Sequence, residues 1–407
     1  MNFYFNLVLN SLLDLKMKFC SCCGEKKSVF IDLGNQPYAN KYPLLNNLQK
    51  EFLNNLTILI CENCFSCSTK SIAPRDEMFE EYFYLSSVNK ELVSHFDDLA
   101  KMIPKESNVL DIGSNDGILL KPLIEKGINA IGIDPSANVG ELANKKGLKT
   151  IIGFFDEKNT KKIINEYGRF DYVIASSIFT HVEDPNSFIS NLVEILEDDG
   201  TFILEIEYIR NIVSNIEFER FYFDRPFYYS IKGIQKIFEK YNLFIQKIEE
   251  INPHGGSLRF YISKLKKTSD KIEELIKSES NFFKSNLNNK FQKLARNEAD
   301  KLKKFLKNAK NEGKKVIGFG CPARFSTITN FANIDSELLP FVIDDSPIKQ
   351  GKLSPGKHIP IVSRNFLKDF EPDVIMVFAY EYFNSIYEFT SQFSAEHFKP
   401  IPLTKLD

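Results

Sequence analysis

Long apolar runs are missing from this 407-residue chain, and none approaches the ~20 residues that a membrane-spanning helix needs. An excess of positive charge is missing too, because 52 Lys and Arg are balanced by 54 Asp and Glu, for a net charge of −2. General nucleic-acid binding depends on a basic surface, so this balance argues against it. With 43% hydrophobic and 26% charged residues, the chain instead has the composition of a globular protein.

The N-terminal stretch MNFYFNLVLNSLLDLKMK is apolar, but it lacks the basic leading region and the small-residue cleavage site of a signal peptide. Residues 1–16 are therefore interpreted either as a short amphipathic extension or as an over-long start ahead of Met17. In both cases we expect a cytoplasmic protein, in which thiols stay reduced. No membrane insertion is expected. The oligomeric state stays open, with a monomer favoured.

Six of the seven cysteines lie between Cys20 and Cys67, in FCSCCGEK and ICENCFSCST. Each C-x2-C pair can hold one edge of a tetrahedral Zn²⁺, and four thiolates leave no open position for water. The spacing predicts a structural zinc ion with these ligands: Cys20, Cys23, Cys61 and Cys64. Cys22 and Cys67 are alternative ligands. Cys321 stands in a distant apolar context, where we expect a buried, inert thiol.

Strand and helix patterns alternate from NVLDIG onward, which predicts an α/β fold with a doubly wound, Rossmann-like parallel sheet. Within it, PNSFISNLVEILEDDG is interpreted as one helix. A Lys-, Glu-, Asn- and Leu-rich stretch without internal Gly or Pro predicts one long helix or a helical pair. The expected division is an extension (1–16), a zinc-binding module (17–78), a central α/β domain (79–265), a helical linker (266–312) and a smaller C-terminal Rossmann-like α/β domain (313–407).

The stretch VLDIGSNDGILL, residues 109–120, places a glycine turn where the first strand of the alternation becomes a helix. Ligands of a doubly wound sheet bind at the carboxyl ends of its strands. Gly113 allows a ligand to approach the backbone and Gly117 helps the chain to enter the helix, although the spacing does not meet the dinucleotide-binding fingerprint. The next strand ends at Asp134 in GIDPS, where a carboxylate can accept both hydroxyls of a ribose.

Acids at two neighbouring strand ends, with a glycine turn between them, are typical of S-adenosylmethionine-dependent methyltransferases. We expect Asp111 and the loop amides to face the amino-acid part of this donor and Asp134 its ribose. GFFD, which begins at Gly153, is expected beside the adenine. The predicted donor-binding residues are Asp111, Gly113, Ser114, Asn115, Gly117, Asp134, Phe154, Phe155 and Ser176. The alternative interpretation is a turn that binds nothing.

Several longer blocks accompany these motifs: CSCC and CENC, DLGNQPYAN, YLSS with His95 downstream, PHGGSLR, VIGFGCPAR and DDSPIKQGKLSPGKHIPI. In this combination the chain resembles, from residue 17 onward, the bacterial sugar C-methyltransferase family. The resemblance implies a zinc module, a central methyltransferase domain and a smaller C-terminal domain. It also implies methylation of a carbon next to the keto group of a nucleotide-linked deoxysugar, in surface-glycan or secondary-metabolite assembly.

In that family a Tyr-x-Glu-His segment after the fifth strand is assigned the acid–base role. Here FERFYFDRPFYYS keeps Tyr222, has Asp224 in place of the glutamate and has Arg225 in place of the histidine. Arginine stays protonated, so it cannot replace a histidine base. The predicted catalytic residues are Tyr222, Asp224 and His181, with Asp224 or His181 as the base and Arg225 holding an anionic intermediate or a phosphate.

Two alternatives follow from this departure. The acceptor is an oxygen or nitrogen atom, for which the demand on a base is milder, or the protein is a zinc-bearing nucleotide-binding protein without turnover. A second departure is AYEYFNSI, which lacks the Trp-Asn pair typical of the family at that place.

A second glycine turn at a helix start, GFGCPAR, offers amides that favour phosphate. Arg324 and Lys349 are therefore expected to hold the diphosphate of a nucleotide sugar. The double glycine beside His254 in PHGGSLR implies close packing against a ligand. The predicted substrate-binding residues are Arg225, His254, Arg324, Lys349 and Tyr84.

Overall fold

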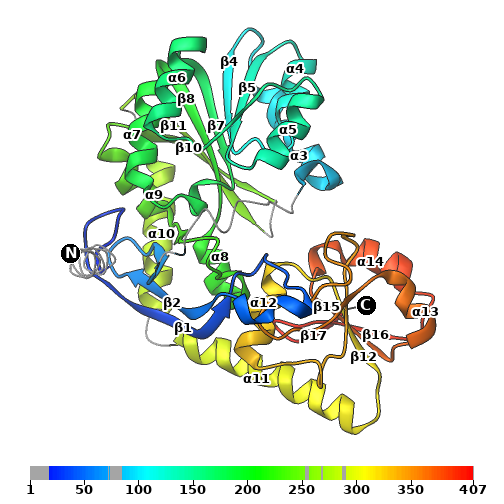
Figure 1. The fold of residues 1–407 in the computed structure, drawn as a ribbon. Coiled ribbons are helices and arrows are strands. Elements are labelled where there is room, and N and C mark those ends of the chain that lie inside the picture. The colour runs from blue at the N-terminus through cyan, green and yellow to red at the C-terminus, as the bar shows by residue number, and fades with distance from the viewer. Residues whose placement is uncertain are drawn as a thin grey trace, which may run out of the picture.

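The computed structural model describes residues 18–71, 73, 85–252, 256–266, 269–286 and 290–406. Within these ranges the chain forms three β-sheets, of four, seven and six strands. Figure 1 shows the seven-stranded sheet above the two smaller sheets, with the helices α10 (Asp270–Asn286) and α11 (Lys290–Asn311) leading from one to the other. None of the described helices is long and apolar enough to cross a membrane.

The four-stranded sheet is antiparallel and combines distant parts of the chain. Its order is β1 (Lys27–Pro37), β2 (Leu53–Cys61), β3 (Cys67–Thr69) and β9 (Phe227–Tyr228). The last of these strands comes from far beyond residue 78, where the sequence analysis ended the zinc-binding module. The Oγ atom of Ser230, just after β9, donates a hydrogen bond to the carbonyl of Cys64. A segment of the central domain therefore completes the N-terminal sheet.

The seven-stranded sheet is parallel except at one edge. Its order is β10 (Phe244–Ile251), β11 (Ser257–Ser263), β8 (Leu196–Glu207), β7 (Phe170–Ser176), β4 (Asn108–Ile112), β5 (Asn129–Asp134) and β6 (Thr150–Ile152). Only β11 runs antiparallel to both of its neighbours. The order reverses between β4 and β7, so the ligand-binding crevice of such a sheet is expected outside the carboxyl ends of these two strands.

Helices cover both faces of this sheet. One face packs against α3 (Lys90–Met102), α4 (Leu120–Glu125) and α5 (Ala137–Lys145), and the other against α6 (Glu157–Tyr167), α7 (Pro185–Ile195) and α9 (Ile231–Glu239). Neighbouring strand residues such as Val109 and Leu110 belong to these two different cores, because side chains alternate across a strand. The predicted doubly wound sheet is confirmed.

The helix expected over PNSFISNLVEILEDDG is shorter than predicted. It ends at Ile195, and Leu196 to Gly200 already belong to β8. Leu196 is fully buried and pairs with Phe170 of β7. Gly200 lies so close to backbone atoms that a Cβ atom would meet the carbonyl oxygen of Phe170 at 3.0 Å. Residues 196–200 therefore form a strand, because pairing with β7 outweighs a composition that favours a helix.

The linker is a helical pair, α10 and α11, rather than one long helix. It is also part of the core, because Phe291 of α11 stacks on Phe30 of β1 with ring centroids 4.7 Å apart. The α12 helix (Ala323–Ala332) packs against both α11 and β1. The linker and the C-terminal domain are thus packed against the N-terminal sheet.

The six-stranded sheet forms a second, smaller Rossmann-like unit. Its order is β14 (Ile361–Val362), β13 (Val342–Ile343), β12 (Val316–Phe319), β15 (Val374–Val377), β16 (Glu396–Lys399) and β17 (Thr404–Leu406). All neighbours are parallel except β16 and β17. α12 follows β12, just as a helix follows each inner strand of the central sheet.

Candidate functional site

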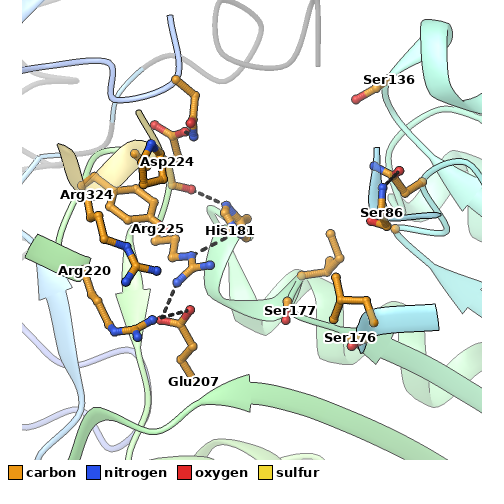
Figure 2. Close-up of a pocket in the computed structure, with 18 of the residues that line it drawn as sticks. Ser86, Ser136, Ser176, Ser177, His181, Glu207, Arg220, Asp224, Arg225 and Arg324 are labelled. Atoms are coloured by element: carbon orange, nitrogen blue, oxygen red, sulfur yellow. Dashed lines mark hydrogen bonds and ion pairs between the residues drawn. The ribbon is translucent and has the colours of Figure 1, made fainter. Parts of the chain in front are cut away.

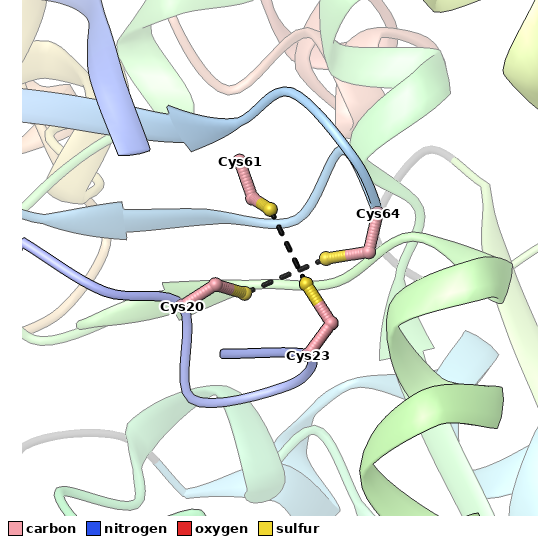
Figure 3. Close-up of side chains that lie close together, drawn as sticks. All are labelled: Cys20, Cys23, Cys61 and Cys64. Carbon is pink, nitrogen blue, oxygen red and sulfur yellow. Dashed lines mark hydrogen bonds between the residues drawn. The ribbon is translucent and has the colours of Figure 1, made fainter. Parts of the chain in front are cut away.

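The four predicted metal ligands converge in the N-terminal module (Figure 3). Their sulfur atoms all lie within 4.8 Å of one another, with Cys20 to Cys64 at 3.5 Å and Cys23 to Cys61 at 3.4 Å. A tetrahedron with Zn–S bonds of about 2.3 Å has sulfur atoms about 3.8 Å apart, so the cluster fits Zn²⁺. The cluster has no position for a water ligand, which is typical of a structural site.

Two matching turns build this cluster. After Cys20-x2-Cys23, the amide of Gly24 donates to the carbonyl of Cys20 at 2.8 Å, and after Cys61-x2-Cys64 the amide of Phe65 donates to the carbonyl of Cys61 at 2.8 Å. Both turn-ending residues have positive φ, +80° at Gly24 and +66° at Phe65. The turns orient both thiols of each pair toward the same point.

The remaining cysteines are not among the four converging ligands. Cys22 and Cys67 are buried but are not among the four converging sulfur atoms, although the thiol of Cys22 lies within hydrogen-bond reach of Cys20 and Cys64, so the geometry favours the predicted ligand set over the alternatives. Cys321 is also buried, and burial raises the pKa of its thiol well above the ordinary value. The prediction of an inert thiol agrees with this environment.

A cavity of about 660 Å³ opens at the carboxyl ends of the central strands and reaches the C-terminal domain. Its wall also includes Asn40 and Tyr42 of the zinc-binding module. Figure 2 shows two groups of lining residues, serines beside the central sheet and charged side chains on the opposite side. All three parts of the chain therefore face one space.

The donor end of the cavity lies at β4 and β5. The carboxylate of Asp134 accepts hydrogen bonds from the amides of Asn115 and Ser136, both at 2.9 Å. Burial raises its pKa above the ordinary value. Gly113 has φ +77°, and a Cβ atom there would lie 2.2 Å from the side chain of Ile178. The tight turn at Gly113 thus lies beside the Asp134 carboxylate, which keeps lone pairs that could accept hydrogen bonds from ribose hydroxyls.

The other predicted donor-binding residues divide into two groups. Asn115, Phe154, Phe155 and Ser176 line the cavity with Gly113 and Asp134. Asp111, Ser114 and Gly117 do not line it. Asp111 is buried beneath the wall, where desolvation, followed by the charges of Asp134 and Glu205, raises its pKa to about 8. We therefore expect these three residues to support the turn rather than to contact the donor.

A network of charged and polar side chains, centred on Glu205, lies beside the β4–β5 end of the cavity. His95 donates from Nε2 to the carboxylate of Glu205 at 2.9 Å, and Arg259 donates from Nε to it at 2.7 Å. Ser176 donates from Oγ to the same carboxylate at 2.5 Å. Sequence reasoning missed Glu205 and Arg259, because nothing in the local pattern shows that β8 and β11 bring them together.

The predicted catalytic residues lie together in a further part of the cavity, which we name the acceptor end because the methyl acceptor is expected there. His181 donates from Nδ1 to the backbone carbonyl of Asp224 at 2.5 Å, and Arg225 donates from Nε to Nε2 of His181 at 3.4 Å (Figure 2). The Arg225 guanidinium pairs with Glu207 at 2.5 Å and lies over the ring of Tyr222 at 5.1 Å. Burial raises the pKa of Tyr222 to about 12. These contacts bring together four residues that the sequence analysis singled out: Tyr222, Asp224, Arg225 and His181.

Asp224 is the buried carboxylate of this group, with 8% of its surface exposed. Its Oδ2 accepts a hydrogen bond from the Asn40 side chain at 2.7 Å. Its Oδ1 has no hydrogen-bond partner in the described part of the chain. Burial raises the pKa of Asp224 above the ordinary value.

Further arginines lie beside this group, each paired with an acid. Arg220 bonds Glu217 at 2.7 Å and Glu381 at 3.0 Å, and Arg324 bonds the other oxygen of Glu381 at 2.6 Å. The second terminal nitrogen of Arg324, Nη1, is buried and has no partner among the described residues. Of these four residues, only Arg324 was predicted.

The C-terminal end of the cavity is built around Asp344. This carboxylate accepts hydrogen bonds from the amides of Cys321 at 2.8 Å and Ser346 at 2.9 Å. Lys349 pairs with it at 3.1 Å and also donates to the carbonyl of Cys321 at 3.1 Å. Arg324, Asp344 and Lys349 all line the cavity. Tyr84 and His254, the two remaining predicted substrate-binding residues, lie outside the described residues.

Three family models match consecutive parts of the chain. The model described as "Putative zinc binding domain" matches residues 20–79, and "Methyltransferase domain" matches residues 84–248. "C-methyltransferase C-terminal domain" matches residues 252–402. The three matches follow the order of the cysteine cluster, the donor end and the C-terminal end of the cavity.

Similar proteins include methyltransferases of several kinds. C-methyltransferase NovU from Streptomyces niveus is 23% identical over 387 residues, which cover 92% of this chain and 92% of NovU. A ubiquinone biosynthesis O-methyltransferase from Rickettsia canadensis (strain McKiel) is 26% identical over 120 residues, 30% of this chain and 49% of that protein. Among solved structures, the PH0226 protein from Pyrococcus horikoshii OT3 aligns with a TM-score of 0.37 and 18% identity, over 47% of this chain and 99% of that chain.

The likeness to NovU extends through all three domains, whereas the O-methyltransferase matches less than a third of the chain. The converging thiolates bind zinc, and the domain that holds the Asp134 turn is a methyltransferase domain. The protein is therefore an S-adenosylmethionine-dependent methyltransferase with a zinc site, and its chain matches, in order, the models of a zinc-binding domain, a methyltransferase domain and a C-methyltransferase C-terminal domain and resembles a C-methyltransferase over 92% of its length.

Proposed function

We propose that this enzyme methylates a carbon next to the carbonyl group of a nucleotide-linked sugar. The supporting observation is that one cavity extends from the Asp134 turn, past the buried carboxylate of Asp224, to the Asp344 turn. A donor at the first turn and a substrate nucleotide at the last would leave the sugar beside Asp224. Surface-glycan and secondary-metabolite assembly are the settings in which such a substrate is expected.

The nucleotide end is supported by the arrangement around Asp344. A carboxylate at the end of a second parallel strand, held by two amides, can accept hydroxyl donors such as those of a ribose. The unpartnered Nη1 of Arg324 offers a hydrogen-bond donor to phosphate oxygens, although the paired Glu381 offsets its charge. Lys349 is likewise neutralised by Asp344. We therefore propose that Arg324 contributes direct hydrogen bonds to the diphosphate and that Lys349 orders the turn.

Asp224 is the base that the geometry favours. The Nδ1 proton of His181 is held by the Asp224 carbonyl, and its Nε2 faces a nitrogen of Arg225, which disfavours a further positive charge. The raised pKa of Asp224, caused by burial, brings this carboxyl closer to the working range of a general base. In this proposal His181 and Arg225 position the segment and do not take the proton.

The proposed reaction then proceeds in two steps. Asp224 takes the proton from the carbon next to the carbonyl, and the electron pair of the broken C–H bond forms the enolate. The phenol of Tyr222, kept protonated by its raised pKa, can donate a hydrogen bond to the enolate oxygen. The enolate carbon next bonds to the methyl carbon of the donor as the S–CH₃ bond breaks and S-adenosylhomocysteine leaves. In-line positioning of the two carbons supplies much of the acceleration.

Deuterium exchange tests this proposal. The enzyme is incubated in deuterated buffer with a nucleotide-linked 4-keto-6-deoxysugar and S-adenosylhomocysteine, and the sugar is analysed by mass spectrometry. We expect one deuterium at the carbon next to the carbonyl, and a loss of exchange of about 100-fold or more in Asp224→Asn. Asp97→Asn, a change at an exposed acid of α3, is the matched control and should exchange at the wild-type rate.

Two outcomes would contradict the proposal. Methyl transfer to this substrate without exchange, and with the methyl group on oxygen or nitrogen, would favour the alternative acceptor. Full exchange in Asp224→Asn would remove Asp224 from the role of base.

A further inference from the structure

The zinc-binding module contributes a polar side chain to the acceptor end of the cavity. Asn40 lies in the connection between β1 and β2, 184 residues away from Asp224 in the sequence, and its Nδ2 donates to Oδ2 of Asp224 at 2.7 Å. We infer that Asn40 is a positioning residue that orients the Asp224 carboxylate for proton abstraction. This inference rests on the proposed role of Asp224 as the base.

The two oxygens of Asp224 have different environments. Oδ2 is held by Asn40, whereas Oδ1 is buried without a hydrogen-bond partner in the described residues. The Arg225 guanidinium contacts Glu207 at 2.5 Å and His181 at 3.4 Å, and neither contact involves Oδ1. A carboxylate fixed through one oxygen presents the other in a defined direction. In this arrangement the free oxygen is the one that takes the proton.

The loop that carries Asn40 is anchored on both sides. Tyr38 stacks on Phe52 with ring centroids 4.1 Å apart, and Phe52 packs edge-on against Phe223, the residue before Asp224, at 5.3 Å. Two residues after Asn40, the hydroxyl of Tyr42 donates to the carbonyl of Cys321 at 2.7 Å. The same aromatic contacts therefore fix the donor and the acceptor of the Asn40–Asp224 hydrogen bond.

The charge of Asp224 depends on this bond and on a small set of neighbours. Burial has the largest effect and raises the pKa of Asp224, and the Asn40 amide followed by the Arg225 guanidinium oppose it by favouring the carboxylate. The other titratable groups that face it are His181, bonded to its backbone carbonyl, and the phenols of Tyr222 and Tyr42. Both phenols have raised pKa values through burial and stay neutral across the working range. Loss of the Asn40 donor should therefore raise the pKa of Asp224.

The pH dependence of kcat tests the inference in the full-length enzyme. At saturating donor and sugar nucleotide, we expect Asn40→Ala to move the acidic limb up by about one pH unit, which lowers kcat about 10-fold at any fixed pH on that limb. Asn40→Asp keeps the shape but replaces the donor by a second carboxyl, so the limb should move further. Asn35→Ala, at an exposed asparagine of β1, is the control and should leave the profile unchanged.

The outcomes separate this inference from the proposed function. Because the side chain of Asn40 is exposed, its truncation removes no core packing, and an unchanged thermal midpoint would confirm that the fold is intact. Inactive Asp224→Asn together with unshifted acidic limbs in both Asn40 variants would overturn the positioning role alone. Active Asp224→Asn would overturn the proposed base, and the inference with it.

Discussion

The central and C-terminal sheets carry the same turn in different surroundings. Asp134 accepts hydrogen bonds from two amides at 2.9 Å, and Asp344 accepts them from two amides at 2.8 and 2.9 Å. In each sheet a positive-φ glycine, Gly113 or Gly320, directly follows a strand, and its amide donates at 2.7 Å to the carbonyl of the residue before that aspartate. The turn is thus set by local geometry that two sheets of different size share.

The surroundings of the two turns differ in charge. Asp344 forms an ion pair with Lys349 at 3.1 Å. The pKa of Asp134, in contrast, is shifted by burial and by hydrogen bonds, without a contribution from a charged neighbour. Two positions before Gly113, β4 carries the buried Asp111. The corresponding position in the C-terminal sheet, two residues before Gly320, is Gly318 of β12, which has no side-chain charge. A shared turn can therefore serve different ligands, because its neighbours decide which chemistry it accepts.

The largest expected effect comes from removing one aspartate at a time. Asp134→Ala should weaken binding of S-adenosylmethionine by about 10- to 100-fold, because two ribose hydroxyls lose a charged acceptor. Asp344→Ala should leave donor affinity unchanged and raise KM for the nucleotide sugar by a similar factor. Calorimetry with the donor and steady-state kinetics with the sugar measure the two effects. Undiminished donor affinity in well-folded Asp134→Ala would break the assignment of the first turn.

The two glycines should differ in their tolerance of a side chain. At Gly320, a Cβ atom would lie 2.4 Å from the Cβ of Ala379 and 2.9 Å from its backbone nitrogen, which cannot move aside. At Gly113 the obstacle is the flexible side chain of Ile178. Both substitutions carry the cost of positive φ, so Gly320→Ala should lower the thermal midpoint by about 5 °C and Gly113→Ala by about half as much. Equal losses would show that backbone strain alone decides.

The smallest expected effect concerns Asp111, the buried acid that the central sheet has and the C-terminal sheet lacks at the corresponding position. The pKa of Asp111 is about 8, raised first by burial, so the folded chain keeps a proton that the unfolded chain releases near pH 4. Stability therefore falls as pH rises from about 4 to about 8. Asp111→Asn lacks this dependence, and its thermal midpoint relative to wild type should be about 2 to 4 °C higher at pH 8 than at pH 5. A pH-independent difference between the two proteins would contradict the buried proton.

The parts of the site that follow local spacing were predictable. The C-x2-C pairs gave the four zinc ligands, and the alternation of strands and helices placed Gly113 and Asp134 at adjoining strand ends. Tyr222, Asp224 and Arg225 came from a short segment read against the family pattern. Each of these features is specified by a sequence pattern that spans only a few neighbouring residues.

The features that were missed depend on contacts between distant segments. Asn40 reaches Asp224, and Glu207 pairs with both Arg220 and Arg225, through packing of whole domains. The predicted end of α7 was wrong for the same reason. The residues that follow Ile195 have a helical composition, but they pair with β7 and form the start of β8 instead. Asp344 was within reach of sequence reasoning, since it directly follows a strand and comes after a glycine turn, much as Asp134 does at the end of β5.

The pairing of β3 with β9 has a consequence for how the chain matures. The last strand of the N-terminal sheet is translated about 160 residues after its partner, and it directly follows the segment that contains Tyr222 and Asp224. A nascent chain therefore holds an incomplete metal domain until most of the central sheet has emerged from the ribosome. Completion of the N-terminal sheet and placement of the segment with Tyr222 and Asp224 are in this way coupled through β9.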